Sequence, residues 1–81
     1  MEQTLTIYGI DGCAPCANAK RLCSVKGIPY TFIKVDTEAV KQTLLDRMDI
    51  KGNVTVPQIF DVTGTHIGGF RELKEWVKAN R

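Results

Sequence analysis

The sequence lacks a long hydrophobic run, a block of like charge and an even set of cysteines. No apolar stretch approaches the about 20 residues that a membrane-spanning helix needs, and residues 1–4 have no signal-peptide character. Eleven basic and nine acidic residues are scattered along the chain and leave a net charge of +2, so neither nucleic acid nor a membrane is expected as a partner. Three cysteines is an odd count, which argues against a secreted disulfide framework and favours the reducing cytoplasm.

The length and composition of the sequence are sufficient for one folded domain. The chain has 81 residues, of which 43% are hydrophobic and 25% charged. This apolar content is too high for a disordered chain, and the length leaves room for one hydrophobic core. Because no repeat, low-complexity tract or linker interrupts it, the sequence predicts a single domain over residues 1–81, and we expect a monomer.

The apolar periodicity predicts four strands and three helices. The strands cover residues 5–8, 30–35, 58–60 and 66–67. The first helix covers 13 to about 26, the second runs from a cap at Asp36 or Thr37 to a break at Gly52-Asn53, and the third follows Gly68-Gly69. A strand–helix–strand unit makes the first two strands parallel, and the later hairpin is antiparallel. The expected fold is therefore α/β, with the order βαβαββα, a four-stranded mixed sheet and helices on both faces.

Two cysteines three positions apart, Cys13 and Cys16, fall where the first strand leads into the first helix. If Cys13 is the N-cap, unpaired backbone N–H groups and the positive end of the helix favour its thiolate. The thiolate is the attacking species in thiol–disulfide exchange. Cys16, one turn inside and facing the core, would then resolve the mixed disulfide. The pattern predicts a redox pair in which Cys13 is the nucleophile.

Other interpretations of this pair stay open. A structural zinc site needs four ligands, and only Cys23 and His66 remain as additions. Cys23 lies two turns along the helix from Cys16, too far for easy convergence on one ion, and is expected to pack in the core as a small apolar group. The pair could also be incidental.

The cysteine pair and two further motifs together resemble a small dithiol glutaredoxin. The motifs are Thr55-Val56-Pro57-Gln58-Ile59-Phe60 and Gly68-Gly69-Phe70, and the resemblance runs from Leu5 to about Lys78. It implies a thioredoxin-like fold and a glutathione-dependent thiol–disulfide oxidoreductase, which reduces protein disulfides and glutathione mixed disulfides through a Cys13–Cys16 dithiol. Glutathione is then the reducing co-substrate and no bound cofactor is required. Disulfide-containing proteins, ribonucleotide reductase among them, are the implied partners.

The resemblance also implies where glutathione binds. The peptide bond before Pro57 would be cis and lie against the cysteines, and the backbone of Val56 would pair with the substrate's cysteinyl residue. The γ-glutamyl end would meet the start of the last helix. The implied binding set is Cys13, Thr55, Val56, Pro57, Gly69, Phe70, Arg71 and Glu72. From the residues alone, Pro57 could merely start a strand, the glycines could merely satisfy a turn, and Arg71 and Glu72 could lie on a solvated helix face.

The sequence departs from the family's pattern inside the cysteine motif. Proline directly precedes the second cysteine, as Pro15, whereas in the usual family motif it follows the first. Because proline has no N–H, Pro15 removes a donor that a Cys13 thiolate would otherwise use. We therefore expect a more reducing pair than in typical glutaredoxins.

A second departure precedes the motif. Ile10, which is followed by Asp11, stands where the family commonly carries a Lys or Arg that binds the glycyl carboxylate of glutathione. Lys51 or Gln58 could supply that contact instead. Together with the proline, this departure keeps an alternative open, a glutaredoxin-like redoxin reduced by thioredoxin reductase. A binder of a metal or an iron–sulfur cluster through Cys13 is a further alternative.

Overall fold

A computed structural model describes residues 4–52 and 54–80 of the protein. In chain order its elements are β1 (Leu5–Gly9), α1 (Ala14–Val25), β2 (Tyr30–Lys34), α2 (Glu38–Met48), β3 (Gln58–Phe60), β4 (His66–Gly68) and α3 (Phe70–Asn80). The order βαβαββα that the apolar pattern predicts is confirmed.

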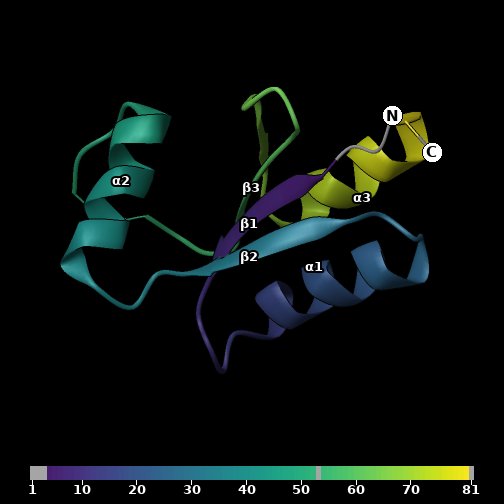
Figure 1. Ribbon diagram of the computed structural model, residues 1–81, viewed down its shortest axis with the longest axis horizontal. Coiled ribbons are helices and arrows are strands. Elements are labelled where there is room, and N and C mark those ends of the chain that lie inside the picture. Colours follow the sequence, from purple (N-terminus) through teal and green to yellow (C-terminus); the bar gives the residue numbers. More distant parts are fainter. Residues whose placement is uncertain (1–3, 53, 81) are drawn as a thin grey trace.

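The four strands form one mixed sheet in the order β2-β1-β3-β4 (Figure 1). β1 and β2 are parallel, whereas β1 pairs antiparallel with β3 and β3 pairs antiparallel with β4. The parallel β1–β2 pair results from the α1 crossover, and the antiparallel β3–β4 pair results from the hairpin that joins these two strands. The pairing shifts register between Ile59 and Phe60, so β4 is not a regular continuation of the ladder.

Helices cover both faces of the sheet, as predicted. α1 and α3 lie together on one face and α2 lies on the other (Figure 1). Successive side chains of a strand point to opposite faces, so β1 sends Ile7 toward α1 and α3, and Tyr8 toward α2. The larger core holds Leu5, Ile7, Ala19, Cys23, Ile28, Ile59, Leu73 and Val77. The smaller core, under α2, is built on Tyr8, Leu44 and Phe60.

The ends of α2 differ in how well the sequence predicts them. The start is capped by Thr37, whose hydroxyl oxygen accepts from the backbone N–H of Val40 at 3.2 Å. The end comes before the expected break at Gly52-Asn53, because Asp49 adopts a left-handed conformation with φ of 55°. Asn53 itself lies outside the described residues. Within the described ranges, no helix is long and apolar enough to cross a membrane.

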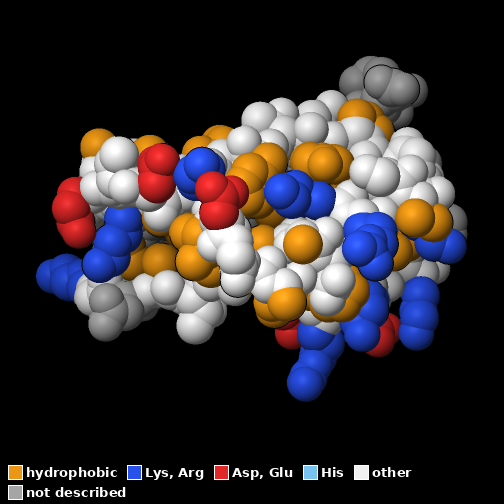
Figure 2. Space-filling model, turned by 90° about the horizontal axis from the view of Figure 1, so that it is seen from below, with side chains coloured by type: hydrophobic (Ala, Val, Ile, Leu, Met, Phe, Trp, Pro, Cys, Tyr) orange, Lys and Arg blue, Asp and Glu red, His pale blue; other side chains and the backbone are white. Residues whose placement is uncertain are grey.

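Charges that are scattered along the chain gather on the folded surface. α1 carries Lys20 and Arg21 and no acidic residue, and Lys26 is its C-cap. Over the half of the molecule where α1 lies, most of the charged side chains in view are Lys and Arg (Figure 2). Lys26 also borders a cleft of about 500 Å³ together with Lys74 and Lys78 of α3. The side of the molecule where α1 lies therefore presents a mainly basic surface.

Candidate active site

Cys13 is the N-cap of α1, as the sequence predicts. Its backbone is extended, with φ of −101° and ψ of 111°, and its Sγ accepts from the backbone N–H of Cys16 at 3.2 Å. The two cysteines form a disulfide with a Cα–Cα distance of 5.2 Å. Cys16 is 1% exposed whereas Cys13 is only half-buried, so an incoming disulfide can reach Cys13 more easily than Cys16. The backbone N–H of Cys16 and the positive end of the helix would stabilise a thiolate at Cys13.

Pro15 lies in the first turn of α1, between the two cysteines. Because proline has no N–H, it contributes no donor toward the Cys13 sulfur, and the contact from Cys16 is the one that the first turn supplies. That the pair is more reducing than in typical glutaredoxins stays a prediction.

The loop before β3 faces the disulfide. The Val56–Pro57 peptide bond is cis, as the resemblance implies, and Pro57 is buried. The carbonyl oxygen of Val56 lies 3.9 Å from the Sγ of Cys13. A polypeptide whose cysteine reacted with Cys13 would therefore lie beside the backbone of Val56.

Gly9, at the end of β1, makes room for the cysteine pair. A Cβ at this position would lie 2.8 Å from the Sγ of Cys16 and 2.9 Å from the Cε1 of Phe32. Both distances are shorter than real Cβ contacts, so only glycine fits between the sulfur and the ring. The sequence does not predict this role of Gly9, because the crowding comes from Cys16 on α1 and Phe32 on β2.

Gly9→Ala is expected to weaken both the fold and the active site. The added methyl group must displace the Cys16 sulfur or the Phe32 ring, and overpacking of this kind costs about 1–3 kcal/mol. Urea unfolding measures the loss of free energy, and disulfide turnover measures the effect on the site. Gly69→Ala is the control for stability, because its Cβ would meet its nearest neighbours at ordinary contact distances of 3.4 and 3.5 Å. Equal stability losses in the two variants would contradict the prediction.

The start of α3 is closed by one of its own side chains. Glu72 Oε1 accepts from the backbone N–H of Gly69 at 2.8 Å, as in a capping box. This bond is the main reason that the pKa of Glu72 lies below its usual value. The side chain folds back over Gly68, where a Cβ would lie 2.7 Å from the Cγ of Glu72 and where φ is 128°. The backbone N–H of Gly69 is therefore already engaged by Glu72.

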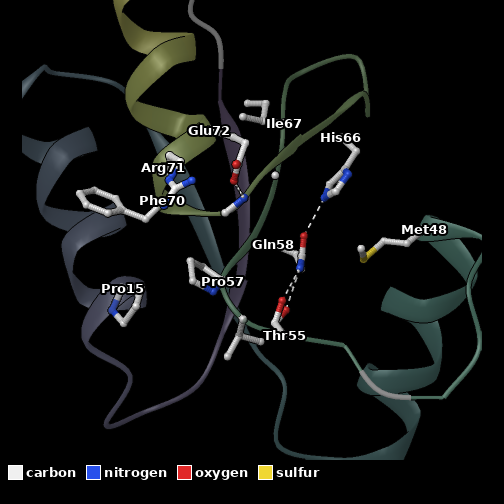
Figure 3. A pocket seen from close by; sticks show the side chains of 13 residues that line it. Pro15, Met48, Thr55, Pro57, Gln58, His66, Ile67, Phe70, Arg71 and Glu72 are labelled. Carbon is white, nitrogen blue, oxygen red and sulfur yellow. Dashed lines mark hydrogen bonds between the residues drawn. The ribbon is translucent and has the colours of Figure 1, made fainter.

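One pocket of about 720 Å³ gathers the residues that the family resemblance implies (Figure 3). Thr55, Val56, Pro57, Gly69, Phe70, Arg71 and Glu72 all line it, and Cys13 lies beside it through the contact with Val56. Figure 3 shows Pro15, Phe70 and Arg71 to the left of Pro57, Glu72 above it, and Met48, Gln58 and His66 to the right. The predicted set thus lies together, and the pocket extends beyond it.

Gln58 and Lys51, the two residues that could replace the missing cation, line different pockets. Gln58 lines the main pocket, whereas Lys51 lines a separate pocket near the C-terminal end of α2. All the polar atoms of the Gln58 side chain are in hydrogen bonds within the protein. Neither side chain is therefore placed as a free partner for a carboxylate in the main pocket.

An ion pair that sequence analysis does not foresee lies just before the cysteines. Lys34 Nζ contacts Asp11 Oδ2 at 2.8 Å, and both side chains are exposed. The hydrogen bond from Lys34 lowers the pKa of Asp11, and the same bond raises the pKa of Lys34. β1 and β2 are parallel, with Gly9 opposite Lys34, which brings Lys34 close to the loop after β1. The negative charge of Asp11 is therefore paired, and a cation does lie near this loop.

Cys23 packs in the larger core, as predicted. It is 0% exposed, and burial raises the pKa of its thiol. A buried thiol of raised pKa is a poor nucleophile. Among the residues that the structure describes, no three His, Cys, Asp or Glu side chains gather as a metal site.

Comparisons with known proteins agree with this geometry. The family model named Glutaredoxin matches residues 5–67. A glutaredoxin of Enterobacteria phage T4 is 40% identical over 85 residues, covering 89% of this chain and 97% of that protein. The crystal structure of glutaredoxin 1 from Francisella tularensis, complexed with cacodylate, superposes with a TM-score of 0.77 at 33% identity, covering 95% of this chain and 94% of the other. For a buckwheat glutaredoxin–glutathione complex the TM-score is 0.74 at 30% identity, covering 95% of this chain and 70% of the other.

Three findings indicate the same family: the fold, the disulfide at a Cys-x-x-Cys spacing and the sequence relatives. The resemblance drawn from the motifs is confirmed, and the Cys13–Cys16 pair fits the redox-active site of such proteins. The chain belongs to the glutaredoxin family and is a thiol–disulfide oxidoreductase.

Proposed function

We propose that the chain reduces disulfides with Cys13 as the nucleophile and Cys16 as the resolving thiol. The Cys13 thiolate attacks one sulfur of a substrate disulfide, forms a mixed disulfide with it and releases the other sulfur as a thiolate. With a protein disulfide, Cys16 then attacks the Cys13 sulfur, which forms the Cys13–Cys16 disulfide and releases the second substrate thiol. The observation that carries this assignment is the disulfide at the start of α1, with the more exposed sulfur facing Val56.

Glutathione is the proposed electron donor. One glutathione thiolate attacks the Cys13 sulfur of the Cys13–Cys16 disulfide, which forms a glutathione mixed disulfide and releases the Cys16 thiolate. A second glutathione thiolate attacks the glutathionyl sulfur, which forms oxidised glutathione and releases the Cys13 thiolate, so two electrons enter the dithiol. When the substrate is itself a glutathione mixed disulfide, Cys13 takes the glutathionyl group directly and Cys16 is not needed. Family membership supports this donor, as does the structural similarity to a buckwheat glutaredoxin that was solved in complex with glutathione.

Glutathione is proposed to bind with its cysteinyl residue beside the Val56 backbone and its γ-glutamyl end at the start of α3. Because Glu72 engages the Gly69 amide, the carboxylate of the ligand would meet the amides of Phe70 and Arg71 first. The positive guanidinium of Arg71, which lines the same pocket, would add to this attraction. Glu72, once released from Gly69, would accept from the ligand's amino group.

The wider setting is also part of the proposal. Residues 1–81 are proposed to form a single glutaredoxin domain that works as a monomer in the cytoplasm without a bound cofactor. Its protein substrates are proposed to include ribonucleotide reductase, a role that the family carries. The family resemblance and the cysteine count support these proposals.

A coupled assay tests the electron donor. NADPH oxidation is followed with a glutathionylated peptide as substrate, first with glutathione and glutathione reductase, then with thioredoxin reductase alone. Turnover in the first system, and none in the second, is expected. Turnover only with thioredoxin reductase would overturn the glutathione assignment and favour the redoxin alternative suggested by Pro15 and Ile10. Failure in both systems, together with visible absorbance and bound metal in the purified protein, would favour the metal or iron–sulfur alternative.

A further inference from the structure

Gln58 is unusual among the described residues because it is the one polar side chain that is buried, with 8% of its surface exposed. Its Nε2 donates to the carbonyl oxygen of Thr55 at 2.8 Å and contacts the Thr55 hydroxyl at 3.2 Å. A buried amide of this kind is costly unless it is fully hydrogen-bonded. Its position directly after Pro57 means that these bonds act on the loop that faces the cysteines.

His66 completes the hydrogen bonding of this amide. Its Nε2 lies 2.7 Å from Gln58 Oε1, across the β3–β4 hairpin (Figure 3). The backbone oxygen of Thr55 can only accept, so the amide nitrogen of Gln58 must face Thr55 and the amide oxygen must face His66. The Nε2 of His66 therefore carries the proton. The hydrogen bonds therefore run in one direction: His66 donates to Gln58, and Gln58 donates to Thr55.

The loop that these hydrogen bonds hold has no regular secondary structure, although Val54 packs against the smaller core and Pro57 is buried. Residues 49–57, between α2 and β3, form neither helix nor strand wherever the structure describes them. Thr55 is followed by Val56, whose carbonyl oxygen lies 3.9 Å from the Cys13 sulfur. The ring of His66 is itself held against Phe60, with ring centroids 5.1 Å apart. The hydrogen bonds that run from His66 in the hairpin through Gln58 to Thr55 thus contribute to the position of Val56 relative to Cys13.

We propose that His66 and Gln58 are positioning residues, which hold the Thr55–Val56 backbone where a substrate's cysteinyl residue pairs with it. This inference rests on the proposed function, in which the substrate lies along Val56. Neither side chain is near enough to the sulfurs to share a hydrogen bond with them, and Gln58 has no polar atom left for the ligand. Their effect is expected on the Michaelis constant of the substrate rather than on the cysteine chemistry.

A pair of matched substitutions at His66 tests the proposal. In His66→Gln the amide nitrogen can occupy the place of Nε2 and still donate to Gln58. In His66→Asn the shorter side chain places its nitrogen near the position of Nδ1, so the bond is lost. With a glutathionylated peptide, His66→Asn is expected to raise KM about fivefold to tenfold at nearly unchanged kcat. In His66→Gln, KM is expected to stay close to the wild-type value. Gln58→Met has a similar volume but lacks the amide donor and acceptor, and it is expected to raise KM by about the same factor as His66→Asn.

Three further measurements make the outcome decisive. Thermal unfolding establishes whether each variant is folded at the assay temperature. If His66→Asn is unfolded, the KM of Gln58→Met tests the proposal instead. The reduction potential of the Cys13–Cys16 pair is expected to be the same in all variants. Wild-type KM in His66→Asn and Gln58→Met would overturn the proposal, as would equal losses in His66→Asn and His66→Gln. If the wild-type protein itself fails to turn over the substrate with glutathione, the proposed function fails instead, so the two failures are distinguishable.

Discussion

Cys13→Ser is expected to lower the rate of disulfide reduction about a thousandfold or more, with every disulfide substrate. The reason is chemical, because a serine hydroxyl at this N-cap remains protonated at neutral pH, whereas the Cys13 thiolate is favoured by the Cys16 N–H and the end of α1. The fold should tolerate the change, since Cys13 is half-buried and serine is itself a good N-cap. The coupled NADPH assay measures the loss.

Cys16→Ser is expected to separate two reactions. A glutathione mixed disulfide needs only the nucleophile, so turnover of a glutathionylated peptide should persist. A protein disulfide needs the resolving thiol, so its reduction should stall as a mixed disulfide on Cys13, visible as an added mass after acid quenching. Cys23→Ala is the control, because the buried Cys23 takes no part and turnover should be retained. Loss of turnover in Cys23→Ala, or its retention in Cys13→Ser, would contradict the assigned roles.

The features of this site that the sequence predicts are local. The N-cap role of Cys13 depends on residues within one turn of helix, and those residues adjoin it in the sequence. The strand at 58–60 is likewise bounded by a nearby proline and turn residues, and the structure has it at the predicted place. Where one helical turn or one strand decides the outcome, spacing and residue type are sufficient.

The features that the sequence does not predict join residues from different elements. His66 bonds to Gln58 across the β3–β4 hairpin, a contact that no spacing in the sequence indicates. That contact depends on the hairpin pairing, which shifts register beside Phe60 and is not encoded in a period of two. The crowding at Gly9 likewise requires α1 and β2 to be in place before it can be seen.

Phe60→Ala is expected to cost about 3–5 kcal/mol of folding free energy, a large share of the about 5–15 kcal/mol that stabilises a typical domain. Phe60 is 1% exposed and lies at the centre of the core under α2. The ring of Tyr8 packs against it at an angle of 82° with centroids 5.7 Å apart, and the guanidinium of Arg47 lies 4.1 Å from its centroid. Alanine would leave a cavity where these groups meet, and α2 would lose its main contact with the sheet.

Thermal and urea unfolding measure this loss, with Val62→Ala as the matched control. Val62 lies two residues away in the sequence but is 54% exposed, so truncating it should change stability by less than about 1 kcal/mol. In a domain of this size each kcal/mol lowers the midpoint of thermal unfolding by about 4–8 °C, so Phe60→Ala should unfold at least about 12 °C below the wild type. Since Phe60 also supports the ring of His66, disulfide turnover below the new midpoint should fall as well. A Phe60→Ala protein as stable as Val62→Ala would mean that α2 is held by contacts other than this core.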